Sequence, residues 1–171
     1  MNSIIKKMEN KPYIHRIYIC PNAGLPMKPL ERVKVLEGIG IEGDRYALRL
    51  GAFSKSNPPK IRDITLITKM GIDTANHYLK LNGLLEFDIS ETRRNIVIEN
   101  LLPDELNALV GKVFFLGRLK FKGVELCDPC ERPSKLANKK SFQIAYENNG
   151  GIRAQIMDDG EIAIGDILET L

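Results

Sequence analysis

The chain has 171 residues, a length that suits one domain with one substantial hydrophobic core. Hydrophobic residues make up 43% and charged residues 27% of it, which is typical of a globular protein and not of a disordered one. The 25 basic and 22 acidic residues leave a formal charge of only +3. This excess is too small to indicate nucleic-acid binding.

Cysteine usage and the N-terminal sequence indicate the compartment. Three cysteines, an odd number, do not form the disulfide framework of a small secreted protein. The apolar stretch within residues 1–11 is too short for a signal peptide, and no segment is long enough to span a bilayer. We therefore expect a cytoplasmic protein that makes no membrane contact, with residues 1–12 as a loose N-terminal segment.

The first part of the chain predicts two strands separated by turns. Residues 15–20 and 31–36 alternate as strands do, and Pro-Asn-Ala-Gly at residues 21–24 is turn chemistry. Three glycines within residues 38–43 indicate tight turns or a close backbone approach, because glycine alone tolerates positive φ cheaply. Residues 52–59, rich in Ser, Asn and Pro, are predicted to be an exposed loop.

The remainder of the chain predicts more strands than helices. Short strands are expected at residues 61–68, 92–98, 112–116, 119–126, 152–157 and 161–169. Helical segments are expected at residues 72–79, ending near Gly83, and at residues 103–109 and 134–146. Many short strands at regular spacing favour a mainly β, barrel-like fold with a few short peripheral helices. We expect residues 1–171 to form a single domain.

Cys127 and Cys130 form the clearest chemical motif, in a loop directly after a predicted strand. The pair is compatible with half of a zinc site, with a redox-active dithiol, or with a reactive or metal-ligating thiolate. The other zinc donors, Cys20 and two histidines, form no second closely spaced pair, and the βαβ context of a thioredoxin-type dithiol is missing. A thiolate is therefore preferred, with Arg132 and Lys135 nearby in sequence to favour it, and chemically inert loop cysteines remain the alternative.

Basic residues form the other candidate sites. Arg93 and Arg94 precede Asn95 at a strand entrance, and two guanidinium groups beside an amide suit a phosphate. Asp44 and Arg45 follow the glycine turns, where the arginine can reach an anion and where an ordinary salt bridge is equally compatible. Further basic clusters, at residues 60–62 and 135–140, suit an anionic ligand or are solvated surface charge.

Taken together, the motifs resemble the MOSC family, the domains found at the C-terminus of molybdenum-cofactor sulfurases. The resemblance rests on the order and spacing of motifs at residues 40–47 (Gly-Ile-Glu-Gly-Asp-Arg-Tyr-Ala), 92–97 (Thr-Arg-Arg-Asn-Ile-Val), 126–130 (Leu-Cys-Asp-Pro-Cys), 109–112, 150–154 and 160–166. It covers nearly the whole chain from about residue 17 onward. In the mitochondrial amidoxime-reducing relatives an arginine precedes the metal-binding cysteine, whereas Pro129 stands here, as in short stand-alone bacterial members.

The resemblance implies a MOSC-type β-barrel and a pterin-based molybdenum cofactor (molybdopterin). It implies that Cys130 binds molybdenum or carries sulfur, and that Cys127 is a secondary, resolving thiol. Arg94 and Asn95 match the family's cofactor-facing pair and Arg45 gains support. We add Asp44, Arg93 and Lys135 to the expected cofactor-binding residues.

Two functions follow from the resemblance. The first is a molybdenum-dependent oxidoreductase that reduces a small N-hydroxylated or N-oxygenated substrate with electrons from a separate reductase. The second is a sulfur carrier that holds a persulfide received from a cysteine desulfurase. Neither a sulfurase domain nor a ferredoxin module is visible in the sequence, so either function needs a partner protein.

Overall fold

The computed structural model describes residues 10–171, and eleven strands dominate it. The strands are β1 (Tyr13–Ile19), β2 (Lys28–Leu30), β3 (Arg32–Leu36), β4 (Gly40–Ile41), β5 (Ile64–Thr68), β6 (Ile96–Glu99), β7 (Val113–Leu116), β8 (Leu119–Leu126), β9 (Ile152–Ile156), β10 (Gly160–Ala163) and β11 (Leu168–Thr170). The helices are α2 (Lys69–Leu81), η1 (Ile89–Thr92), α3 (Pro103–Asn107), α4 (Arg132–Ala137) and α5 (Phe142–Ala145). The prediction of a mainly β chain with a few short helices is confirmed.

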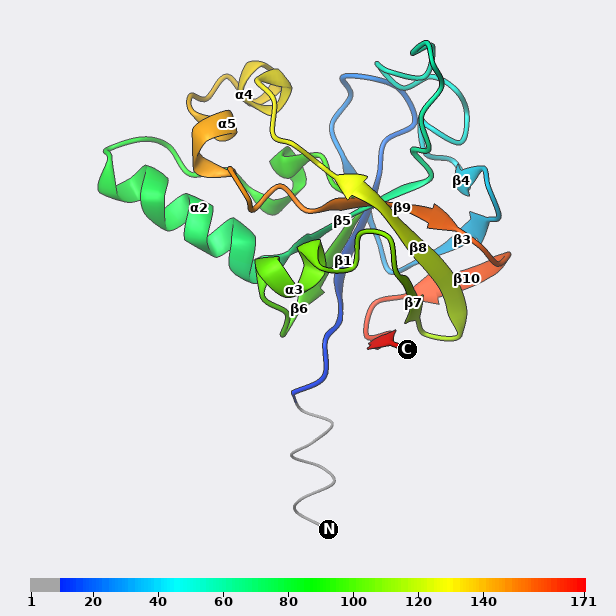
Figure 1. Cartoon of the computed structure of the whole chain (residues 1–171). Coiled ribbons are helices and arrows are strands. Elements are labelled where there is room, and N and C mark those ends of the chain that lie inside the picture. Colours follow the sequence, from blue (N-terminus) through cyan, green and yellow to red (C-terminus); the bar gives the residue numbers. More distant parts are fainter. Residues whose placement is uncertain (1–9) are drawn as a thin grey trace.

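The strands form a large curled sheet and a small one (Figure 1). Eight strands pair in the order β11-β7-β8-β9-β5-β6-β1-β2, and three more pair in the order β10-β3-β4. All described pairs are antiparallel except β5 and β6, which are parallel and are connected through α2. The large sheet curls into a half-barrel, so the expected barrel-like fold is present in open form.

The central strands bury both of their faces. One hydrophobic cluster fills the inside of the half-barrel, and a second lies between the sheet and the helices α2 and α5. On β1, for example, Ile17 and Ile19 belong to the first cluster, whereas Tyr18, and Cys20 just after the strand, belong to the second. Successive strand residues point to opposite faces, so this strand is apolar on both sides.

Helix α2 forms as the sequence predicts. Thr68 caps its start, because the hydroxyl oxygen accepts a hydrogen bond of 2.9 Å from the amide of Gly71. Ile72, Ala75 and Leu79 are buried against the second core cluster. The chain leaves the helix just before Gly83, which has a φ of +68°.

Two expected elements are each divided in the structure. The helix expected at residues 134–146 is two helices, α4 and α5, because Asn138 and Ser141 adopt positive φ values of 53° and 70°. The strand expected at residues 161–169 is β10 and β11, which belong to different sheets. Gly165, with a φ of +92°, supplies the turn between them.

Strand boundaries also differ at three places. Thr92, expected at the start of a strand, instead ends the short helix η1, and β6 begins at Ile96. The strand expected from residue 61 begins only at Ile64. The short strand β4 lies in the glycine segment that was expected to turn, and β2 lies where no element was predicted.

The N-terminal segment expected to be loose lies largely outside the described residues, which begin at Asn10. Its last residues contact the barrel. Lys11 Nζ is 2.8 Å from the carboxylate of Glu169, and the carbonyl of Pro12 accepts a hydrogen bond from the amide of Leu168. Within residues 10–171, no helix is long and apolar enough to cross a membrane.

Candidate functional site

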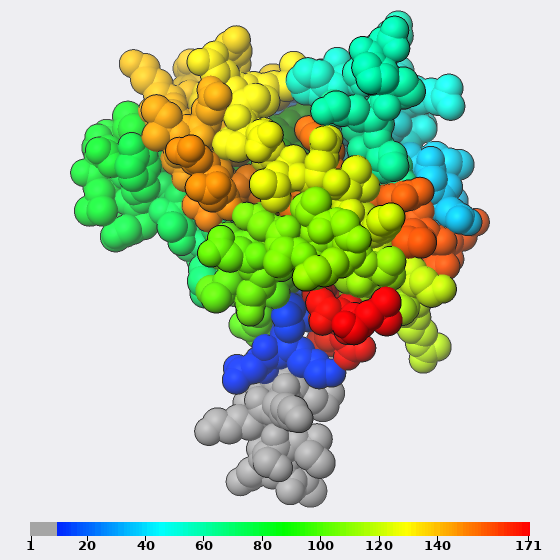
Figure 2. All heavy atoms as spheres, in the orientation of Figure 1, coloured from blue at the N-terminus to red at the C-terminus, as the bar shows by residue number. Residues whose placement is uncertain are grey.

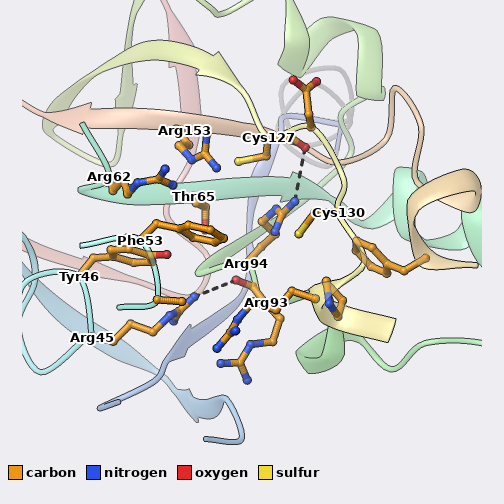
Figure 3. A pocket seen from close by; sticks show the side chains of 15 residues that line it. Arg45, Tyr46, Phe53, Arg62, Thr65, Arg93, Arg94, Cys127, Cys130 and Arg153 are labelled. Atoms are coloured by element: carbon orange, nitrogen blue, oxygen red, sulfur yellow. Dashed lines mark hydrogen bonds between the residues drawn. The ribbon is translucent and has the colours of Figure 1, made fainter. Parts of the chain in front are cut away.

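A pocket opens between the loop after β4 and the loop after β8, and it contains most of the candidate residues (Figures 2 and 3). It encloses about 700 Å³, including its open mouth. Figure 2 shows the surface hollowed between the teal segment and the yellow segment, which come from these two loops. Six arginines line the pocket: Arg45, Arg62, Arg93, Arg94, Arg132 and Arg153. The only acid among its lining residues is Asp128.

The two cysteines of the loop after β8 have different environments. Cys127 and Cys130 both line the pocket, but Cys127 is only 3% exposed whereas Cys130 is an exposed thiol. In Figure 3 the sulfur of Cys130 points into the same space as the guanidinium group of Arg94. A molecule in the pocket or at the surface can therefore reach Cys130 more readily than Cys127.

Two glycines hold the cysteine loop against the sheet. The amide of Cys127 donates to the carbonyl of Gly151 over 2.8 Å. A Cβ on Gly150 would lie 2.2 Å from the Cys127 carbonyl oxygen, and one on Gly151 would lie 1.9 Å from the carbonyl oxygen of Leu66. Only glycine permits such close passage, so the position of the cysteine loop depends on this Gly-Gly pair.

Arg94, just before β6, is hydrogen-bonded to the loop after β8 and to the segment before β9. Its Nε donates to the carbonyl of Gly150 over 2.8 Å, and its terminal nitrogens donate to the carbonyls of Thr92 (3.2 Å) and Cys127 (3.5 Å). The planar fork of the guanidinium is thus fixed by three backbone oxygens. Arg94 presents a fixed positive charge beside the cysteine loop.

Asp44 holds Arg45 in place, and Arg45 in turn contacts Arg93. Asp44 is 1% exposed, and its Oδ1 accepts from the Cys20 amide (2.9 Å) and lies 3.3 Å from the guanidinium of Arg45. Arg45 in turn donates to the carbonyl of Arg93 over 3.4 Å. Burial, and then the charge of Arg45, lower the pKa of Arg93. Asp44 therefore positions Arg45 from behind and does not line the pocket itself.

Asn95 and Lys135 lie outside the pocket lining. Asn95 is 3% exposed, and its side-chain oxygen accepts from the amide and the hydroxyl of Thr65. Its side-chain nitrogen donates to the carbonyl of Tyr18 over 3.1 Å. The side chain of Lys135 is 77% exposed and lies 3.6 Å from Glu131. A contact of either residue with a cofactor remains a prediction.

Several pocket residues were not among the predicted site residues, and they include Arg62, Arg153, Tyr46 and Phe53. Arg62 lies in the basic cluster at residues 60–62, and Arg153 lies in one of the MOSC-like motifs, so both had a sequence signal. Arg153 reaches the pocket while paired with Glu125 over 2.6 Å. Phe53 belongs to the loop expected to be merely exposed, and nothing in the sequence marks it as part of a site.

The zinc alternative gains no support from the structure. Across residues 10–171, no three side chains of the His, Cys, Asp and Glu types gather closely enough to hold a metal ion. A structural zinc site needs four such donors. The exposed Cys130 shares its pocket with six arginines, and no cluster of metal-ligating side chains accompanies it within residues 10–171.

The family model of the MOSC domain matches residues 64–169, which is more than half of the chain. The chain belongs to the MOSC family. MOSC domains are associated with the molybdenum cofactor. The matched range includes Arg94, Cys127, Cys130 and Arg153, whereas Arg45 and Arg62 precede it.

Solved structures show the same MOSC fold at low sequence identity. YuaD from Bacillus subtilis aligns with a TM-score of 0.69 and 17% identity, covering 93% of this chain and 96% of that one. YiiM from Escherichia coli has a TM-score of 0.66 and 13% identity over 94% and 69% of the two chains. YiiM from Geobacillus stearothermophilus has a TM-score of 0.65 and 13% identity over 94% and 75%. No curated protein matches the chain.

Proposed function

We propose that this MOSC domain binds a molybdenum cofactor in the arginine-lined pocket, with the thiolate of Cys130 as a ligand of the metal. The proposal rests chiefly on one observation: an exposed thiol shares a pocket with six guanidinium groups. A soft thiolate suits molybdenum, and guanidinium groups recognise phosphate through paired hydrogen bonds. The residues present therefore match both the metal and the phosphate of a pterin cofactor.

Different arginines have different tasks in this proposal. Arg94, fixed by three backbone carbonyls, and Arg45, positioned by Asp44, offer charge in defined places. Preorganised donors bind an anion with little additional ordering cost. Arg132 lines the same pocket and adds a further guanidinium group close to the cysteine loop in sequence. Cys127 is buried and supports the loop that carries Cys130.

The proposed reaction is the reduction of a small N-hydroxylated or N-oxygenated substrate. The cofactor, when bound, supplies a two-electron redox centre, and a separate reductase supplies the electrons. The chain contributes the thiolate of Cys130, the charge that retains the cofactor, and the pocket mouth through which a substrate enters. Three free thiols fit the reducing cytoplasm, where we place the protein.

A sulfur-carrier role is the second candidate, and the contrast between the two cysteines favours it. Cys130 is exposed and can accept a sulfur atom from a cysteine desulfurase, whereas Cys127 is buried behind it. In this case mass spectrometry after incubation with a desulfurase and cysteine should find one added sulfur on Cys130. An unmodified Cys130 would argue against the carrier role.

The test of the cofactor proposal is the molybdenum and pterin content of protein produced in cofactor-replete cells. Wild type should contain both, and Cys130→Ser should lose the metal. Cys127→Ser is the matched control, because it makes the same chemical change in the same loop, and it should retain most of the metal. Circular dichroism confirms that each variant is folded. Full molybdenum content in Cys130→Ser would refute the ligand assignment, and neither metal nor pterin in wild type would favour the carrier role.

A further inference from the structure

A second hollow adjoins the cofactor pocket on the side away from the cysteine loop. It encloses about 880 Å³, including its open mouth, and neither cysteine of the loop lines it. Its wall is formed mainly by the segment between β4 and β5, with Arg49, Ser54, Lys60 and Arg62 among its members. The MOSC match begins at residue 64, after this segment, and the cofactor proposal assigns no ligand to the second hollow.

Three side chains are shared by the two hollows and separate them: Tyr46, Phe53 and Arg62. The guanidinium carbon of Arg62 lies 5.1 Å from the ring centre of Phe53 and 5.8 Å from that of Tyr46. The guanidinium carbon of Arg45 also lies near Tyr46, 5.0 Å from its ring centre. Cation–π attraction therefore orders the partition, and Arg62 contributes charge to both sides.

Two residues that line the second hollow carry polar groups without partners. The hydroxyl of Ser54 and the Nε of Arg62 are both buried, and neither forms a hydrogen bond with any described residue. A buried polar group without a partner is costly, and groups of this kind are usually satisfied by water or by a ligand. The Nε of arginine can only donate, so its partner must be an acceptor.

Charge determines which acceptor fits. Three cationic side chains, Arg49, Lys60 and Arg62, line the hollow, and Asp63 is the only acid among the lining residues. Asp63 is only 6% exposed, and its carboxylate accepts a hydrogen bond of 3.0 Å from the amide of Ile156. Lys60 has only an exposed, 3.5 Å contact with Glu125. The free donors and the excess positive charge together match an anion with several oxygens.

We infer that this second hollow binds a phosphate-class oxyanion, with Arg49, Lys60 and Arg62 as its cationic contacts and Ser54 as a hydroxyl donor. The ligand is either inorganic phosphate or the phosphate group of a larger molecule whose remainder extends across the Tyr46 partition. The site is separate from the pocket that holds Cys130, and its occupation requires neither molybdenum nor a thiolate.

The test is a titration of the full chain with inorganic phosphate, followed by amide chemical shifts in an NMR spectrum. The amides of Arg49, Ser54 and Lys60 should shift together and saturate at one affinity. Lys60→Gln and Arg49→Gln should each weaken that affinity by about threefold to tenfold, as the loss of one charge-assisted contact predicts. Lys80→Gln, the same change at an exposed position on α2, should leave it unaltered.

Ser54→Ala separates a binding role from a structural one. Because the Ser54 hydroxyl has no partner in the described chain, its removal should leave the melting temperature unchanged or higher. The same change should weaken phosphate binding. A fall in melting temperature with unchanged phosphate affinity would overturn the assignment of Ser54 as a ligand donor.

A phosphomonoester identifies the source of the oxyanion. Phenyl phosphate should bind more tightly than phosphate alone if the ligand is a larger molecule, because its ring can contact Tyr46 and Phe53; equal affinities would identify inorganic phosphate. The inference fails if phosphate shifts only the amides around Arg94 and Cys130, or if Lys60→Gln, Arg49→Gln and Lys80→Gln bind it equally well. Since no molybdenum enters the measurement, failure of the cofactor proposal would leave this result unaffected.

Discussion

Gly151→Ala tests the close backbone approach between the start of β9 and strand β5, next to the cysteine loop. Gly151 has a φ of +82°, and an added Cβ would lie 1.9 Å from the carbonyl oxygen of Leu66 and 3.0 Å from the Cα of Ile67. Both atoms belong to the backbone of β5, a central strand held by β9 on one side and β6 on the other. Neither atom can move aside without breaking sheet pairing.

The expected cost has two parts. Placing alanine in the left-handed region costs about 1–2 kcal/mol. Relief of the contact with Leu66 requires β9 to move away from β5, and the lost hydrogen bonds and packing cost at least about 2 kcal/mol more. We expect the free energy of unfolding to fall by about 3–5 kcal/mol in total, a loss that few single substitutions cause. The Cys127 amide, which donates to the Gly151 carbonyl, should lose protection from hydrogen exchange.

Gly111→Ala is the matched control. Gly111 has the same φ of +82°, but an added Cβ would meet no atom within 4 Å. Its substitution should cost only the conformational part, about 1–2 kcal/mol. Urea denaturation followed by circular dichroism measures both variants against wild type. Equal losses for Gly111→Ala and Gly151→Ala would refute the argument that close backbone packing, and not φ alone, requires glycine at position 151.

Three further predictions concern buried or partly buried polar groups. Tyr146→Phe should leave the unfolding free energy unchanged or raise it by about 1 kcal/mol, because the buried hydroxyl has no partner within residues 10–171; a clear loss on thermal melting would contradict this. Burial raises the pKa of Asp63, so the wild type should lose stability as pH rises from the ordinary value of 3.8 through the raised folded pKa. Asp63→Asn should not lose stability in this way, because its side-chain oxygen can still accept from the Ile156 amide. If the urea midpoints of wild type and Asp63→Asn change in parallel between acid and neutral pH, the raised pKa of Asp63 does not affect stability. Arg94→Lys keeps the charge but loses the fork that holds Gly150, and should cost about 1–2 kcal/mol in chemical denaturation, whereas an unchanged midpoint would show that the charge alone suffices.

The sequence predicted most of the strands because their apolar patterns are strong. The strand at residues 119–126 and the helix after Thr68 were placed correctly, since burial on one or both faces determines their residues locally. The helix expected at residues 134–146 was wrong as one element. Its break depends on Asn138 and Ser141 in the left-handed region, a conformation that Asn tolerates but does not require.

The candidate site was predictable only where local motifs marked it. Arg45, Arg94, Cys127 and Cys130 stand in recognisable motifs, and the structure brings all four to one pocket. The membership of Phe53 depends on the folding of a long loop over the sheet, which no local pattern encodes. Neither did the sequence reveal that Cys127 is buried and Cys130 exposed, because that difference arises from the close packing of the loop on Gly150 and Gly151.

The most direct test of the central claim, that the Cys130 thiolate binds molybdenum, is X-ray absorption at the molybdenum edge on cofactor-loaded protein. Wild type and Cys127→Ser should show the same sulfur coordination, with a thiolate in addition to the sulfur atoms of the pterin. Cys130→Ser should lose most of the metal, and any metal that it retains should have one sulfur ligand fewer. Full molybdenum occupancy in Cys130→Ser, or unaltered sulfur coordination of the metal that it retains, would contradict the claim.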